Sequence, residues 1–164
     1  MENKYQSIAS KVLKEVETEL NHPVIVKHWK SNRPYSGKAY CKTYTIITPE
    51  PKSDISLNTY LHELGHIVTT HKLSCMREYL ACNFALDKMR DNGLSISRKI
   101  KKHHNWYIAF SLAQALNRNL KTIPDDLKPF KKYLTVRYSH TMTVKNGIKS
   151  FSKNKRYISD ISKC

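Results

Sequence analysis

The chain has 164 residues, 40% of them hydrophobic, and a formal net charge of +16. This length and composition suit one domain with enough apolar residues to form a core. No charge-free apolar run approaches the roughly 18 residues of a membrane-spanning helix, and the charged N-terminus does not resemble a signal peptide, so we expect no membrane partner. The cysteines form no C-x-x-C pair and suit reduced thiols in a cytoplasmic protein: Cys41, Cys75, Cys82 and Cys164.

The first fifty residues predict one helix followed by strands. Apolar residues recur at intervals of three and four over 2–20, the period of an amphipathic helix. Residues 24–29 are typical of a strand, and the proline and glycine within 31–37 indicate a turn. Residues 38–48 are rich in Tyr, Thr and Ile with partial alternation, which predicts a second strand.

The next helix, which Ser53 or Asp54 can cap, contains the pattern H-E-x-x-H. Positions i and i+4 of a helix lie on one face about one turn apart, so His62 and His66 can bind one metal ion together. Zinc accepts neutral imidazole and keeps a position open for water when it has only three protein ligands. Glu63 can then act as the general base. The motif predicts zinc-assisted hydrolysis of a peptide bond.

The alternative is an ordinary helix with two histidines on its polar face. An apolar stripe at helical spacing buries one side of this helix: Leu57, Leu61, Leu64 and Val68. Both histidines lie roughly a quarter to a third of a turn from that stripe, which directs them toward a neighbouring cleft and not into the core. This arrangement favours the metal site.

A third ligand is expected from the following helix, which runs from residue 76 to about Asn92 with Gly93 suited to its C-terminal cap. One stripe of this helix has a carboxylate followed by small or apolar residues: Glu78, Ala81, Cys82, Ala85 and Met89. The short connection 69–75 favours an antiparallel helix pair, so Glu78 would face the two histidines and complete a two-His, one-Glu zinc site. The alternative for Glu78 is a solvated carboxylate at a helix N-terminus.

The motifs resemble those of the ImmA/IrrE-type zinc metallopeptidases, which belong to the gluzincins. The resemblance rests on H-E-L-G-H at 62–66 and E-x-x-A-x-x-F-A at 78–85, and it covers about residues 35–92. It implies a zincin-like α+β domain with a small, mostly antiparallel sheet, in which His62, His66 and Glu78 hold zinc. Glu63 would be the general base of that site.

The resemblance also implies how a substrate would bind. Residues 39–48 would form an edge strand that holds an extended peptide by main-chain hydrogen bonds. The substrate would be a specific protein, such as a DNA-bound regulator. Many relatives carry an acidic or amide residue after the alanine, where it supports the first histidine ligand, whereas this chain has Cys82, a poorer acceptor and by itself typical of a small buried residue.

The basic residues are concentrated in the second half of the chain. Residues 1–93 contain 13 Lys/Arg and 10 Asp/Glu, whereas residues 94–164 contain 16 and 3. Ser95 or Ser97 can cap a long helix that ends near Asn117, and four cations crowd its first two turns against the helix dipole: Arg98, Lys99, Lys101 and Lys102. These residues predict nucleic-acid binding, and a solvated surface is the alternative.

The C-terminal residues give a weaker pattern. A short helix is expected over 124–134, and 135–164 suit either a hairpin around Asn146-Gly147 or a disordered basic tail. We therefore expect a metallopeptidase domain over 1–134 and a basic extension over 135–164.

Two functions remain open: a zinc metallopeptidase, and a nucleic-acid-binding protein whose zinc site is structural or catalytically silent. Glu63 favours the enzyme, because a structural site needs no base beside the metal. A crosslink protease of the SprT type is also open, although its usual zinc-ribbon cysteine pairs are missing. Four residues could stabilise an oxyanion: Tyr44, Tyr60, His71 and His103.

Overall fold

The computed structural model describes residues 3–29, 34–145, 148–160 and 162, with side chains described outside 138–154. It combines helices with small sheets, which confirms the predicted α+β class. None of the helices within these ranges has the length and apolar character needed to cross a lipid bilayer.

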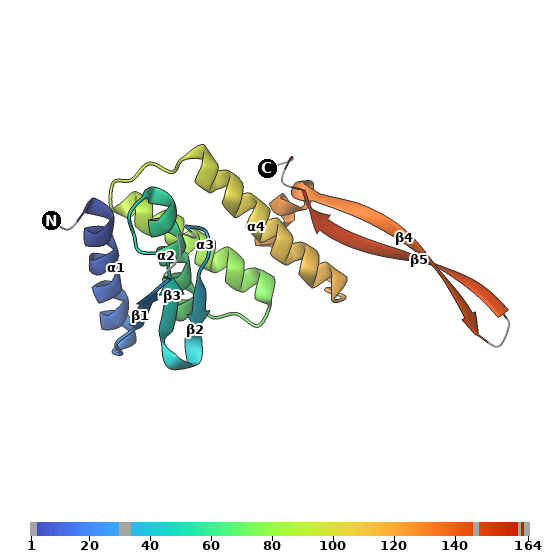
Figure 1. Ribbon diagram of the computed structural model, residues 1–164, viewed down its shortest axis with the longest axis horizontal. Helices are drawn as coiled ribbons and strands as arrows, with labels where there is room; N and C mark the ends of the chain where they lie inside the picture. Colours follow the sequence, from blue (N-terminus) through green and yellow to red (C-terminus); the bar gives the residue numbers. More distant parts are fainter. Residues whose placement is uncertain (1–2, 30–33, 146–147, 161, 163–164) are drawn as a thin grey trace. The chain divides into compact units, whose positions relative to one another are not determined.

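The chain forms two compact units, Met1–Lys101 (unit 1) and Lys102–Cys164 (unit 2). Helix α4 (Arg98–Asn117) begins in the first and ends in the second (Figure 1). The other elements of unit 1 are α1 (Lys4–Leu20), β1 (Ile25–His28), β2 (Lys38–Tyr40), the 3-10 turn η1 (Cys41–Thr43), β3 (Thr45–Thr48), α2 (Asp54–Val68) and α3 (Ser74–Asp91). A boundary between compact units does not test where a functional domain ends, so the division expected at residue 134 stays a prediction.

Helix α1 confirms the amphipathic pattern over residues 2–20. Asn3 caps it: its side chain accepts hydrogen bonds from the backbone N–H groups of Tyr5 and Gln6, and its own backbone N–H donates to the Gln6 side chain. The helix ends at Asn21, whose φ of 49° is left-handed. The apolar face of α1 is buried against α2.

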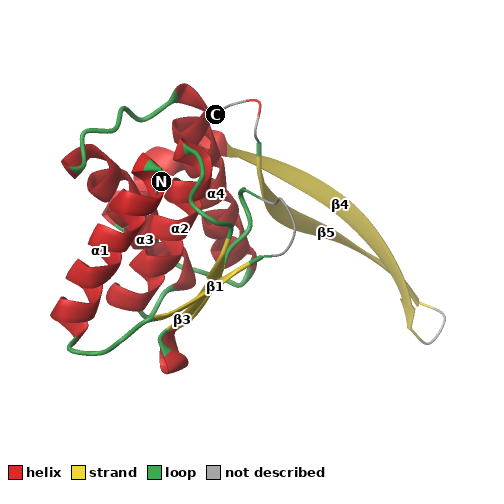
Figure 2. Ribbon diagram, turned by 60° about the vertical axis from the view of Figure 1, so that its left-hand side comes forward, coloured by secondary structure: helices red, strands yellow, loops and turns green. Residues whose placement is uncertain are grey.

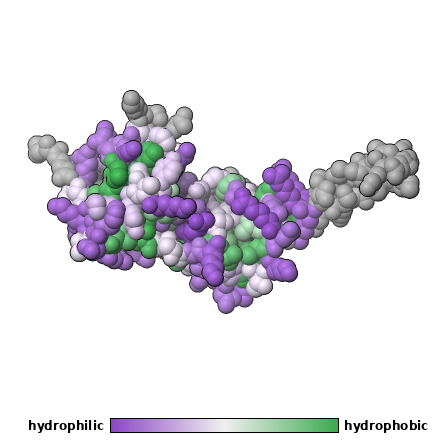
Figure 3. Space-filling model, turned by 90° about the horizontal axis from the view of Figure 1, so that it is seen from below, coloured by the Kyte–Doolittle hydropathy of each residue, from purple (hydrophilic) through white to green (hydrophobic). Residues whose placement is uncertain are grey.

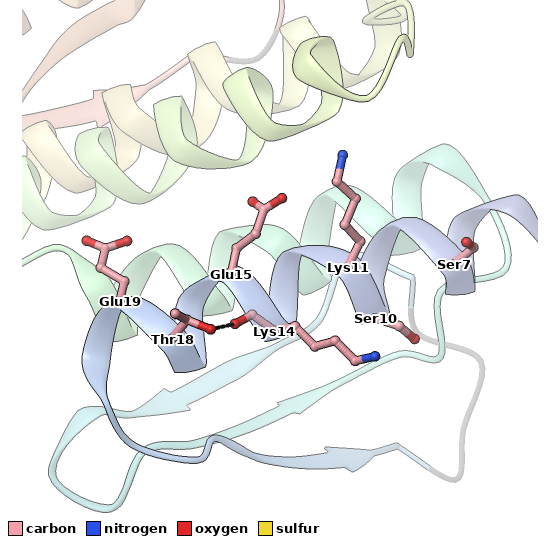
Figure 4. Close-up of a pocket in the computed structure, with 7 residues that line it drawn as sticks. All are labelled: Ser7, Ser10, Lys11, Lys14, Glu15, Thr18 and Glu19. Carbon is pink, nitrogen blue, oxygen red and sulfur yellow. Dashed lines mark hydrogen bonds between the residues drawn. The ribbon is translucent and has the colours of Figure 1, made fainter.

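A shallow depression runs along the polar face of α1 (Figure 4). One helix supplies its lining residues: Ser7, Ser10, Lys11, Lys14, Glu15, Thr18 and Glu19. Two polar contacts join this face to α3, from Lys88 Nζ to Glu15 Oε2 at 2.7 Å and from Lys11 Nζ to Asn92 Oδ1 at 3.0 Å. Exposed pairs of this kind contribute at most about 1 kcal/mol each, so apolar packing holds α1 in place.

The sheet of unit 1 has the strand order β1-β3-β2 (Figure 1), and its β1 and β3 lie side by side in Figure 2. Strands β1 and β3 are parallel, with Ile25 opposite Thr45, while β2 and β3 are antiparallel, with Lys38 opposite Ile47. The expectation of a mostly antiparallel sheet therefore fails for this sheet, since one of its two pairings is parallel. Strand β2 lies at an edge.

The prediction of one strand over 38–48 is wrong. The chain reverses at η1 and at Tyr44, whose φ of 45° is left-handed, so the segment forms two paired strands. Left-handed φ values are uncommon outside glycine, asparagine and aspartate, and no such residue marks this turn. The Tyr44 ring stacks on His22 at 4.2 Å, a tertiary contact that accompanies the reversal and that the local sequence does not announce.

Helix α2 is the central element of unit 1. Its apolar stripe is fully buried at Leu57, Leu61 and Leu64. Around it pack apolar residues from α1, β3, α3 and α4: Val12, Val16, Ile46, Ala85, Met89 and Ile100. Because α2 is enclosed in this way, its orientation and the direction of its histidines are set by the core.

Unit 2 contains the rest of α4, the 3-10 segment η2 (Asp125–Tyr133) and a hairpin of β4 (Leu134–Lys145) and β5 (Ile148–Ser159). The strands pair antiparallel from Leu134 opposite Ser159 to Lys145 opposite Ile148. The described part of the segment for which the sequence allowed either a hairpin or a tail is therefore a two-stranded ribbon, and Asn146-Gly147, around which the hairpin was expected, lie outside the described residues. Within the described residues this sheet has no third strand.

Candidate metal site

Helix α2 presents both histidines of the H-E-x-x-H motif on one face. Ser53 is its N-cap and accepts a hydrogen bond from Ser56 N at 3.2 Å, so the expected cap is confirmed at the first of the two candidates. One helical turn then brings the Nε2 atoms of His62 and His66 to 3.1 Å from each other.

Glu78 of α3 completes the cluster. Its Oε2 atom lies 3.3 Å from His62 Nε2 and 3.1 Å from His66 Nε2, which gives a nearly equilateral triangle. A tetrahedral zinc ion with bonds of about 2.0–2.1 Å needs ligand atoms about 3.3–3.4 Å apart. Glu78 Oε2 is buried and has no hydrogen bond of acceptable geometry among the described residues. A cation at the centre of the cluster would satisfy this acceptor, so the three residues fit a metal ion.

The carboxylate reaches the histidines because α2 and α3 pack closely. A Cβ atom added to Gly65 would lie 2.9 Å from Ala81 Cα and 3.0 Å from Ala81 O, which is too close for any real side chain. The residues of the predicted small stripe on α3 are buried at this contact: Ala81, Cys82, Ala85 and Met89. The expected antiparallel helix pair and its small-residue interface are thus present.

Electrostatics shift Glu78 and His62 toward the protonation states that bind metals, whereas His66 is shifted toward its protonated form. Burial acts to raise the pKa of Glu78, but the two adjacent imidazoles outweigh it and hold that pKa at about 2. Burial lowers the pKa of His62. For His66 burial acts in the same direction, but the Glu78 carboxylate outweighs it and the pKa is raised. An anionic carboxylate and a neutral imidazole are the forms in which these groups bind metals.

Glu63 lies beside the cluster and is only 7% exposed. Burial raises its pKa to about 7, and the neighbouring Glu78 adds to the rise while His66 opposes it. The backbone of Gly37 packs on this carboxylate, since a Cβ there would lie less than 3 Å from Glu63 Oε1, Cγ and Cδ. Thr59 Oγ1 holds the same loop by donating to Pro34 O at 2.6 Å. The sequence indicated Gly37 only as part of a turn.

Cys82 contacts the first histidine ligand. Its Sγ atom lies 3.6 Å from His62 Nδ1, and burial raises the thiol pKa well above its usual value, so the thiol is neutral. The sequence favoured a small buried residue here, and Cys82 is buried. It also occupies the position from which a group can orient the imidazole, which the stripe pattern alone did not reveal.

The four oxyanion candidates lie in different environments. Tyr60 is in the core, where burial raises its pKa, and it lines a pocket with residues of α1 and β1. Tyr44 stacks on His22. His71 Nδ1 accepts a hydrogen bond from Leu73 N at 3.0 Å. His103 belongs to unit 2 and stacks on Tyr107.

The basic residues singled out by the sequence lie on the first turns of α4, where all four are exposed: Arg98, Lys99, Lys101 and Lys102. Ser97 caps this helix through a hydrogen bond from Ile100 N at 3.3 Å. Lys99 Nζ also lies 5.6 Å from the centroid of the Tyr35 ring. Their exposure leaves these cations accessible to an anionic partner.

Comparisons with protein-family models, with curated proteins and with solved structures give no match to the chain. The site is therefore defined by its own geometry. Two residues of α2 and one of α3 form a partly buried triangle of atoms that could hold a metal ion, and the buried Glu63 carboxylate lies next to it.

We predict that Gly65→Ala weakens metal binding about tenfold or more, because the new methyl group forces α3, and with it Glu78, away from the histidines. Competition with a chromophoric chelator measures the affinity. Gly93→Ala is the matched control: Gly93 has φ of 73° and open space around it, so alanine there costs stability without changing the α2–α3 spacing. Equal affinities for the two variants would contradict the prediction.

We also predict that Glu63→Gln stabilises the metal-free protein, prepared with a chelator, as the pH rises toward 8. The carboxyl ionises near 4.5 when unperturbed and near 7 in the fold, so between these values the folded state binds more protons than the unfolded state. Wild-type stability therefore falls as pH rises through this window, by on the order of 3 kcal/mol in total, and glutamine removes the loss. Urea unfolding should show no difference near pH 4 and a growing one up to pH 8; a constant difference would refute the pKa shift.

Proposed function

We propose that the protein is a zinc-dependent metallopeptidase that hydrolyses peptide bonds in a specific protein substrate. The observation that carries this proposal is the buried Glu63 carboxylate beside the triangle of His62, His66 and Glu78. Structural zinc sites have four protein ligands, whereas catalytic sites have three and an open position. Three ligands with an adjacent general base support the catalytic alternative, and they also support the resemblance to the ImmA/IrrE-type family.

The residues of the site have distinct roles in this proposal. His62, His66 and Glu78 would hold zinc, and the chemistry that zinc would supply there is Lewis acidity toward the peptide carbonyl and the attacking water. Glu63 would take a proton from the attacking water and pass it to the leaving amine. Its pKa of about 7 suits this task, because a general acid–base group is most effective when its pKa lies near the working pH.

Strand β2 offers a place for the substrate. It is an edge strand that packs against α2, so its outer main-chain groups can pair with an extended peptide. Gly37, which precedes β2, lies against the Glu63 carboxylate. A peptide paired along β2 would therefore have one end of its paired segment close to Glu63, the proposed general base.

The first test is metal content. We expect protein purified without added metal to contain close to one zinc per chain by elemental analysis. Glu78→Ala should weaken zinc binding by more than about a hundredfold, because it removes a ligand instead of a supporting group. Glu50→Ala removes an exposed carboxylate of the same unit and should leave the zinc content unchanged. Substoichiometric metal with no uptake on titration would exclude the site.

The second test is activity, with a readout that works for a substrate of any identity. Glu63→Gln keeps all three proposed ligands and removes the base, so we expect the rate to fall on the order of a hundredfold to ten-thousandfold with zinc retained. Cells expressing wild type, Glu63→Gln or the control Glu50→Gln are compared by mass spectrometry of protein N-termini. Protein N-termini that appear with wild type and with Glu50→Gln but not with Glu63→Gln would identify the substrate. Identical termini in all three would leave the catalytically silent site as the better proposal.

We propose nucleic acid as a further partner, bound through the basic residues of α4 and unit 2. Exposed cations at the N-terminus of α4 oppose the helix dipole, which a purely structural role does not explain. Arg137 and Arg156 also lie directly opposite each other in the hairpin, an arrangement that a polyanion would relieve. Binding to DNA would bring the enzyme to a DNA-bound substrate.

Charge reversal tests this partner. Lys99, Lys101 and Lys102 changed to glutamate should weaken nucleic-acid binding without altering zinc content, and wild-type affinity should fall steeply with salt as counterions are released. The same change at Lys4, Lys14 and Lys27, which are exposed on α1 and β1, alters the net charge equally and is the control. Salt-independent binding, or equal losses in both variants, would contradict a localised site.

A further inference from the structure

Four aromatic side chains of α4 form a contiguous row in unit 2, which we call the aromatic row: His103, Trp106, Tyr107 and Phe110. The Trp106 and Phe110 rings stack with centroids 5.6 Å apart and planes 22° apart. His103 lies 6.0 Å from both Trp106 and Tyr107 and is nearly parallel to the latter. The row therefore presents flat rings along one helix.

The aromatic row is not the core face of the helix. The buried residues of α4 within unit 2 lie at other positions: His104, Ile108, Ala109, Ser111, Leu112 and Ala113. Phe110 remains 39% exposed, and Trp106 is partly exposed. Water in contact with two stacked rings is unfavourable, so a ligand that covers them would gain free energy.

The net charge of unit 2 and the position of Lys102 on α4 indicate the chemistry of that ligand. Residues 102–164 contain 13 Lys/Arg and only 3 Asp/Glu. Lys102, Trp106 and Phe110 are spaced by four residues and therefore lie on one side of the helix. A cation is followed on this side by two aromatic rings. Figure 3 shows hydrophobic patches, in green, next to hydrophilic ones, in purple, on the face of the molecule that it draws. Aromatic platforms among cations are the means by which proteins bind unpaired bases and their phosphates.

We propose that Trp106 and Phe110 form a stacking platform for unpaired bases, so that unit 2 binds single-stranded nucleic acid. This rests on the nucleic-acid partner proposed above and specifies its form. In a duplex the base faces are already stacked inside, and a side-chain ring on a helix surface would reach only the edges and the backbone. Bases of a single strand can extend the Trp106–Phe110 stack, while neighbouring lysines contact the phosphates.

The two tryptophans allow a direct test. Trp29 is in unit 1, where its Nε1 donates to Ser36 O at 2.8 Å, so the Trp29→Phe protein reports on Trp106 alone. We expect an oligothymidine of about twenty nucleotides to quench Trp106 fluorescence on binding. The same strand annealed to oligoadenine should bind more weakly and quench little. Equal binding and quenching by the duplex would overturn the preference for unpaired bases.

Substitution separates stacking from charge. Trp106→Leu and Phe110→Leu should each weaken oligothymidine binding about tenfold while duplex binding is unchanged. Phe110→Tyr keeps a flat ring and should retain affinity for oligothymidine. Retained affinity in this variant would show that the loss in Phe110→Leu comes from the missing ring and not from misfolding. Phe130→Leu removes an aromatic ring of η2 instead and is the matched control.

The outcomes distinguish this proposal from the broader one. Unchanged oligothymidine affinity in both leucine variants, with salt-dependent binding intact, overturns the stacking platform and leaves phosphate contact in place. No binding of either probe at low salt overturns both. Self-association that both leucine variants abolish, with unchanged oligothymidine binding, would assign the aromatic row to an interface between copies of this chain.

Discussion

The close packing of α2 against α3 at Gly65 is the constraint on which the candidate site depends. Only hydrogen fits at Gly65 beside the Ala81 backbone, and this contact sets how far Glu78 can reach toward His62 and His66. All three candidate metal ligands come from helices and none from a loop, so core packing fixes their separations. The core around α2 therefore both stabilises the fold and sets the distances between His62, His66 and Glu78.

Much of this site could be predicted from the sequence because it depends on local periodicity. The i, i+4 spacing places His62 and His66 on one face, and the short connection after α2 leaves an antiparallel partner as the natural arrangement. The sheet could not be predicted in the same way. Alternation does not encode which strands pair, so neither the parallel β1–β3 pairing nor the reversal at Tyr44 was evident.

Contacts that join segments far apart in the chain were also missed. Glu63 is identified by its motif, but its burial depends on Gly37, which lies 26 residues earlier and indicated only a turn. A glycine just before a strand can mark a close approach of another group, and that was the available signal. For Cys82, the stripe predicted only burial, and it was the family resemblance that associated this position with the first histidine ligand, because the contact with His62 Nδ1 depends on how α2 and α3 are rotated.

The contact between Gly37 and Glu63 has a consequence for how the proposed enzyme could diversify. The backbone at Gly37, which leads into β2, covers the Glu63 carboxylate, so in the proposed enzyme the same stretch of backbone would influence both the pKa of Glu63 and the choice of substrate. A substitution that widens this edge for a bulkier peptide would hydrate Glu63 and make it a weaker base. New specificity along β2 would thus come with altered acidity, and compensating changes would have to arise elsewhere around α2.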